Sequence, residues 1–139
     1  MESTVTLNDG MVFTAEANGH SFLLDAEDEH GGHNAGPRPK PLLLTALAGC
    51  TAMDVISMLR KMRQDVTGLS VKAEGTLTEE HPKTLDDLQV TYTVTGTVDE
   101  GRLRRAVELS EDKYCGVSAM LKAHTTVTSH IVLNGERLE

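Results

Sequence analysis

At 139 residues the chain is long enough to bury the core of one ordinary domain, 1–139. Only 3% of its residues are aromatic and none is Trp, so the core must consist of aliphatic side chains, Met and Ala. The net charge of −8 and the lack of a basic stripe argue against nucleic acid or an anionic membrane as a partner. The segment Met1–Val5 lacks a basic region followed by an apolar stretch, so we expect no secretory signal and a cytoplasmic location.

The first 25 residues predict a β meander. Short alternating segments, Val5–Leu7, Met11–Ala17 and His20–Leu24, are separated by the turn sequences Asn8-Asp9-Gly10 and Asn18-Gly19. Asn-Gly between alternating segments is a strong hairpin signal, because both residues tolerate positive φ. The N-terminal part is therefore predicted to be a three-stranded antiparallel sheet.

Asp25–Lys40 is predicted to be a loop that covers another part of the protein. It is acidic, contains Gly and His, and ends in a Pro-rich segment. Within it, His30 and His33 have the spacing of a metal-ligand pair. Two His residues in a Gly-rich loop are more often solvated, and further ligands would have to come from elsewhere, so we favour solvated side chains.

A helix is predicted from about Pro41 to Gln64. Pro suits the first turn, and the segment Leu42–Ile56 is apolar on nearly all sides. The segment is short for a membrane span and contains Asp54, so it is interpreted as a buried helix. Burial of both faces would require a partner's helix, which favours a homodimer. Gly68 is expected to end the helical region.

Residues 69–139 are predicted to follow the order β-β-α-α-β. The expected elements are strands at 69–78 and 88–98, a helix from the N-cap Asp99 to Tyr114, a short helix at 115–122 and a strand at 125–133. Blocks of strands separated by helices indicate an α+β fold with a largely antiparallel sheet.

Cys50 and Cys115 are the candidate catalytic residues. A thiolate attacks one oxygen of a peroxide and becomes a sulfenic acid, which a second thiol converts to a disulfide. Cys50 lies on the apolar helix, which suits an organic peroxide, whereas Cys115 follows Lys113-Tyr114. Cys is also among the most buried residue types, so spacing alone favours two inert, buried thiols.

Several segments resemble the OsmC/Ohr family of osmotically inducible and organic hydroperoxide resistance proteins. The similarity is colinear over roughly residues 37–133, and the segments Gly-Cys-Thr-Ala-Met-Asp and Lys-Tyr-Cys-Gly-Val-Ser point to the OsmC-like branch. The segments that carry it are 42–55, 59–63, Glu79-Glu80-His81-Pro82, 92–96 and 106–121.

The resemblance implies an intertwined α+β homodimer, with antiparallel sheets wrapped around two long central helices per subunit. It implies a thiol-dependent peroxidase in which Cys50 attacks an organic hydroperoxide and Cys115 resolves the product at a dimer-interface pocket. It also implies no bound cofactor or metal, and an external dithiol reductant of the lipoyl type.

The chain departs from the family where the thiol is activated. Peroxidase members carry a Glu just before the central helix, where this chain has Lys40 and Pro41, and an Arg from the N-terminal part, where no Arg precedes Arg38. We hypothesise that the covering loop supplies both charges. The candidates are Arg38 or Lys40 for the cation, and Glu27, Asp28 or Glu29 for the carboxylate.

The remaining candidates are expected to be structural. Asp54 would be costly to bury unpaired, so it should accept hydrogen bonds or pair with a basic residue. His81 and Tyr114 are expected to serve the turn and the packing, and the six Met residues to fill the core. Two other functions remain open: a non-catalytic binder of an apolar small molecule in the interface pocket, and a scaffold with inert thiols.

Overall fold

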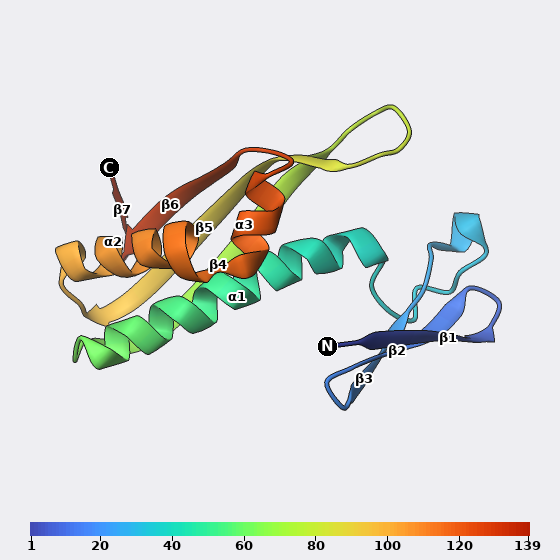
Figure 1. Cartoon of the computed structure of the whole chain (residues 1–139), viewed down its shortest axis with the longest axis horizontal. Coiled ribbons are helices and arrows are strands. Elements are labelled where there is room, and N and C mark those ends of the chain that lie inside the picture. Colours follow the sequence, from blue (N-terminus) through green and yellow to red (C-terminus); the bar gives the residue numbers. More distant parts are fainter. The chain divides into compact units, whose positions relative to one another are not determined.

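The computed structural model describes residues 1–139 and divides the chain into two compact units, Met1–Leu43 and Leu44–Glu139 (Figure 1). Each unit has a sheet of its own, of three and four strands respectively. The structure is therefore α+β, as the sequence predicts.

The first unit contains the predicted meander. Its strands are β1 (Ser3–Asp9), β2 (Val12–Ala17) and β3 (His20–Leu24), all antiparallel and in the order β1-β2-β3. Asn18 and Gly19 both have positive φ, 51° and 77°, as the tight turn between β2 and β3 requires. The N-terminal prediction is confirmed.

Asp25 organises the loop that follows the meander. Its buried carboxylate accepts hydrogen bonds from the backbone N–H groups of Ala26 (2.7 Å), His33 (3.0 Å) and Ala35 (3.0 Å). The bond from Ala35, followed by the other two, lowers the pKa of Asp25 although burial opposes this. One carboxylate thus fixes a segment that includes the short 3-10 helix η1 (Asp28–His30).

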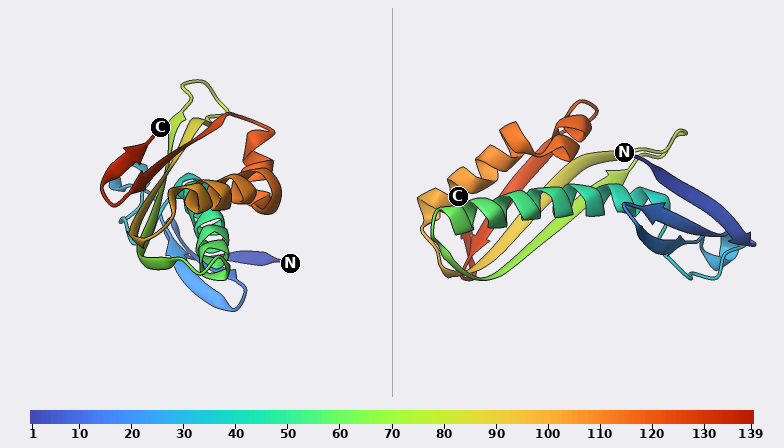
Figure 2. Two further views of the ribbon diagram at one scale, coloured as in Figure 1. Left: turned by 90° about the vertical axis from the view of Figure 1, so that its left-hand side faces the viewer. Right: turned by 60° about the horizontal axis from the view of Figure 1, so that its bottom comes forward.

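The second unit has helices on one face of a four-stranded sheet (Figures 1 and 2). The strands, in spatial order, are β4 (Asp65–Leu77), β5 (Leu85–Thr97), β6 (Val127–Leu133) and β7 (Glu136–Leu138). β5 and β6 are parallel, and the other pairs are antiparallel. The sequence predicted neither β7 nor the parallel pair.

Helix α1 (Pro39–Lys61) buries one stripe of side chains. Leu47, Thr51, Val55 and Leu59 recur every four residues and are fully buried, and the three apolar ones belong to the core cluster. Met53 on another face is 73% exposed. A single chain therefore buries one face of this helix, and burial of the other face by a partner's helix stays a prediction.

By length and apolar composition alone α1 would also suit a membrane span, and 22% of the relevant window is buried. One such helix is weak evidence, because core helices share these properties. α1 is also the one long helix of the chain, so the expected second long central helix of the subunit is not present.

The other helices connect β5 to β6. They are α2 (Glu100–Leu109), the π-helix η2 (Ser110–Tyr114) and α3 (Gly116–Lys122). Asp99 is the N-cap of α2, as predicted, and accepts a hydrogen bond from the Arg102 N–H at 2.9 Å.

Two boundaries differ from the prediction. α1 ends at Lys61, and Arg63 has a positive φ of 59°, so the chain turns there without a glycine. Gly68 does not end a helical region but lies inside β4, where an added Cβ would come within 2.7 Å of the Thr95 hydroxyl oxygen. A side chain at this position would therefore require the Thr95 hydroxyl to move.

Candidate functional site

The two cysteines meet in the second unit, together with one carboxylate. The Sγ atoms of Cys50 and Cys115 and a carboxylate oxygen of Asp54 all lie within 4.8 Å of one another. Cys50 and Asp54 are one turn apart on α1, so their side chains share a face of the helix. Although 65 residues separate the cysteines in sequence, both are free thiols and lie side by side.

The π-helix η2 positions Cys115. The backbone N–H of Cys115 donates to the Ser110 carbonyl at 2.7 Å, the wide turn that defines η2. Cys115 is then the N-cap of α3, and its sulfur accepts a hydrogen bond from the Ser118 N–H at 3.3 Å. These bonds at both its backbone and its side chain fix the thiol.

Burial controls the ionisation of Cys115. Its side chain is only 3% exposed, and this desolvation, reinforced by the neighbouring Cys50 thiol, raises the pKa of Cys115 to about 11. The hydrogen bond from Ser118 opposes the shift but does not cancel it. Cys115 is therefore a neutral thiol at pH 7, which suits a resolving residue better than an attacking one.

Asp54 is oriented by the same π-helix. The Ser110 hydroxyl, which is fully buried, donates to Asp54 Oδ2 at 3.0 Å. This bond confirms the expectation that Asp54 accepts a hydrogen bond. Asp54 takes part in none of the ion pairs of the protein, so the carboxylate beside the thiols has no salt-bridge partner.

A second polar group, which the sequence did not suggest, lies in the core near the thiols. The Tyr92 hydroxyl donates to Glu111 Oε1 at 2.9 Å, and the Ser129 hydroxyl donates to the same oxygen. Tyr92 is fully buried, and this burial raises its pKa. Glu111 belongs to η2, so this network ties the π-helix to β5 and β6. The alternation of β5 indicated that Tyr92 is buried but gave no sign of its partner.

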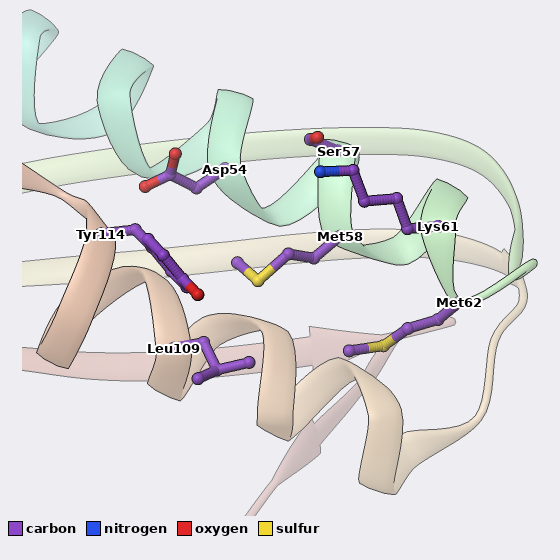
Figure 3. Close-up of a pocket in the computed structure, with 7 residues that line it drawn as sticks. All are labelled: Asp54, Ser57, Met58, Lys61, Met62, Leu109 and Tyr114. Atoms are coloured by element: carbon purple, nitrogen blue, oxygen red, sulfur yellow. The ribbon is translucent and has the colours of Figure 1, made fainter.

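A groove of about 560 Å³ lies between α1 and the segment that contains α2 and η2 (Figure 3). Asp54 is shared by this groove and the thiol cluster, whereas neither cysteine lines it. Apolar side chains form part of its lining. The lining residues are Asp54, Ser57, Met58, Lys61, Met62, Leu109 and Tyr114.

The other predicted residues lie in different settings. Tyr114 is 56% exposed and lines the groove, with Lys113 Nζ 5.3 Å from the centre of its ring. The expectation that all six Met fill the core is also wrong, because Met53 and Met120 are 73% and 69% exposed. His81 is exposed in the loop between β4 and β5.

The covering loop contains an Arg–Glu pair. Arg38 Nε lies 3.1 Å from Glu27 Oε1, and His30 Nδ1 lies 3.4 Å from the other oxygen of Glu27. His33 is exposed and belongs to no group of three or more metal-ligating side chains within reach of one another. Of the charges that the sequence nominated, Arg38 and Glu27 are thus partners of each other.

Comparison with known proteins identifies the class. Residues 31–130 match the family described as OsmC-like protein, and this match covers most of the chain. The chain therefore belongs to the OsmC-like family, which confirms the resemblance found in the sequence.

Individual relatives extend the match to nearly the whole chain. Protein YhfA of Escherichia coli K12 is 37% identical over 130 residues, which cover 92% of this chain and 94% of YhfA. A hypothetical protein from Aquifex aeolicus is 29% identical with a TM-score of 0.85, covering 96% of this chain and 95% of its own.

A more distant solved structure has a functional description. It is a putative organic hydroperoxide resistance protein from Vibrio cholerae, described with captopril bound in one of the active sites. It is 18% identical with a TM-score of 0.65, and the match covers 99% of this chain and 94% of that one. At this identity the similarity shows the fold alone.

Proposed function

We propose that this protein is a thiol-dependent peroxidase that reduces organic hydroperoxides through Cys50 and Cys115. The observation that carries the proposal is the approach of the two sulfurs to within 4.8 Å of each other in one chain. Membership of the OsmC-like family and fold relatives described as organic hydroperoxide resistance proteins support it.

The exposures of the two thiols support a division of roles. Cys50 is partly exposed and Cys115 is buried, so peroxide reaches Cys50 first. The Cys50 thiolate attacks the distal oxygen of the hydroperoxide, the O–O bond breaks, and the alkoxide leaves as the alcohol after taking a proton. Cys50 becomes a sulfenic acid. The sulfur of Cys115 then displaces the hydroxyl as water, and a Cys50–Cys115 disulfide forms.

A disulfide must be reduced for the next cycle. Two electrons have moved from the thiol pair to the peroxide, so an external dithiol of the lipoyl type must return them by thiol–disulfide exchange. The chain needs no bound cofactor for this step. A reducing cytoplasm, the location that we propose, supplies such dithiols.

The activation of Cys50 requires a positive charge, since a thiolate is poorly stabilised beside a carboxylate. The hypothesis that Arg38 and Glu27 replace the family's activating pair stays a prediction.

Turnover with cumene hydroperoxide and dihydrolipoamide tests the proposal. We expect Cys50→Ser to abolish turnover, and Cys115→Ser to retain one round of peroxide reduction with a trappable sulfenic acid at Cys50. A fully reduced wild type without activity, or equal activity in Cys50→Ser, would refute the peroxidase. Failure of both native thiols to react with peroxide or alkylating agents would instead support an inert scaffold.

We infer that the working form is a homodimer in which the exposed face of α1 is covered by a second copy. Met53 is 73% exposed in the middle of an otherwise apolar helix, and Leu43 is 47% exposed. An apolar side chain left facing water costs roughly 25 cal/mol for each Å² uncovered. Association of two α1 helices removes that cost.

The second candidate function is binding of an apolar small molecule. The groove between α1 and the α2–η2 segment favours it, because Met58, Met62 and Leu109 give it an apolar lining beside the polar groups of Asp54 and Lys61. Flexible Met side chains adapt to varied apolar ligands. Saturable binding of an apolar fluorescent probe by a protein without turnover would select this function over the peroxidase.

A further inference from the structure

We propose that Cys50, Asp54 and Cys115 form a three-ligand binding site for a thiophilic divalent cation of the Zn²⁺ class. Their three donor atoms all lie within 4.8 Å of one another, and the chain has no other group of three metal-ligating side chains this close together. The inference concerns the same residues as the proposed peroxidase but does not depend on turnover, because cation binding requires only the reduced thiols.

The distances suit a tetrahedral cation. Zn–S bonds of ~2.3 Å at tetrahedral angles place two sulfurs about 3.8 Å apart, and a sulfur and a carboxylate oxygen about 3.5 Å apart. The three donor atoms already lie within 4.8 Å of one another without a cation. Closing the site therefore requires donor shifts of at most about 1 Å, which small χ1 rotations of three side chains provide.

The ligands are held by second contacts of the kind found around metal sites. The Ser110 hydroxyl donates to Asp54 Oδ2 at 3.0 Å and so fixes the carboxylate beside the two sulfurs. The Ser118 N–H donates to the Cys115 sulfur at 3.3 Å, a bond that a metal-bound thiolate can keep. Two ligands come from successive turns of one helix, so their spacing is fixed.

The charges of the cluster favour a cation. Once a cation has displaced the two thiol protons, the two thiolates and the carboxylate carry three negative charges, and Asp54 has no salt-bridge partner in the protein. A divalent cation compensates these charges directly, and each binding event releases the two thiol protons to solvent. Two sulfurs with one oxygen select a soft, tetrahedral ion such as Zn²⁺ or Cd²⁺ over Mg²⁺ or Ca²⁺. The fourth position stays open to water.

Occupation of this site would block the thiol chemistry. A sulfur that binds the cation has given its electron pair to the metal and no longer attacks a peroxide, and a disulfide leaves neither sulfur as a thiolate ligand. Cation binding and oxidation therefore exclude each other.

Cd²⁺ titration of the fully reduced full-length protein without oxygen tests the proposal, since Cd²⁺–thiolate bonds absorb in the ultraviolet. We expect saturation at one ion for each chain, loss of the absorbance in Cys50→Ser and Cys115→Ser, and none in the disulfide-oxidised protein. Asp54→Asn and Ser110→Ala should weaken binding, the latter by about tenfold or more. Cys50 and Cys115 should be protected from alkylation by bound Cd²⁺.

The control is the double variant His30→Ala, His33→Ala, which removes the other candidate ligand pair and should bind Cd²⁺ like the wild type. Equal affinity in Cys115→Ser, a band without alkylation protection, or loss of binding in the His control would overturn the site. Circular dichroism of each variant excludes a folding defect as the cause. A chain without peroxidase activity that binds Cd²⁺ leaves the proposal intact, whereas an active peroxidase that binds none overturns it.

Discussion

The pKa of Cys115 makes a prediction about stability at high pH. The unfolded thiol ionises near its usual value of 9.0, whereas the folded thiol stays neutral until about pH 11 because it is buried beside Cys50. The unfolded state therefore loses its proton first as the pH rises. The contribution of the neutral thiol to stability is complete below about pH 9 and is lost as the pH rises through 11.

The magnitude follows from the shift. A shift of about two pKa units corresponds to about 3 kcal/mol once both states are ionised. At about pH 10, where only the unfolded thiol is ionised, the loss is about 1 kcal/mol. Tyr92 also has a raised pKa, but burial is the main cause and Cys115 only the last, so most of its effect cancels in the difference between wild type and Cys115→Ala.

The assay is urea unfolding in reducing buffer at several pH values. The free energy of unfolding of the wild type minus that of Cys115→Ala should fall by about 1 kcal/mol between about pH 8 and about pH 10. In a Cys50→Ser background the fall should shrink but persist, because burial is the larger cause. A difference that stays constant or rises over this range would show that Cys115 ionises as it does in the unfolded chain.

Three further predictions address the dimer, a helix cap and thiol activation. Met53→Glu places a charge on the exposed face of α1 and should convert dimers to monomers in sedimentation velocity; an unchanged sedimentation coefficient would contradict the proposed interface. Asp99→Ala removes the N-cap bond of α2 and should cost about 1 kcal/mol in thermal unfolding, whereas Asp99→Asn should cost much less. Arg38→Gln should slow alkylation of Cys50 about tenfold at neutral pH, and Lys40→Gln should not; equal rates in wild type and Arg38→Gln would remove Arg38 as the activating cation.

Local signals made much of the fold predictable. Asn18-Gly19 fixed the β2–β3 hairpin through two positive φ values, and Asp99 marked the start of α2 through its own side-chain bond. Both features depend on residues close in sequence. Gly68 was misassigned, because its close neighbour lies across the sheet at Thr95, and no local pattern records a cross-strand contact.

The site was predictable in its residues but not in its geometry. The sequence singled out Cys50 and Cys115, while their approach depends on η2, whose hydrogen bond from Cys115 to Ser110 has no sequence signature. Asp54 was interpreted as structural because an unpaired buried carboxylate is costly, and the sequence did not indicate that its partner would be the Ser110 hydroxyl of η2.

The π-helix η2 links the stability of the core to the chemistry of the thiols. Its five residues include Ser110, which orients Asp54, and Glu111, which bonds Tyr92, and the chain leaves it at Cys115. In a regular α-helix the Cys115 N–H would bond the carbonyl four residues earlier instead of that of Ser110, five residues earlier. Each later side chain would then be rotated by about 100° around the helix axis, which would separate Cys115 from Cys50. The wide turn would therefore serve both the proposed peroxidase and the proposed cation site. Under these proposals, the reduced chain acts as a peroxidase when a positive side chain compensates Asp54 and the thiolates, and binds a metal ion when the ion does so.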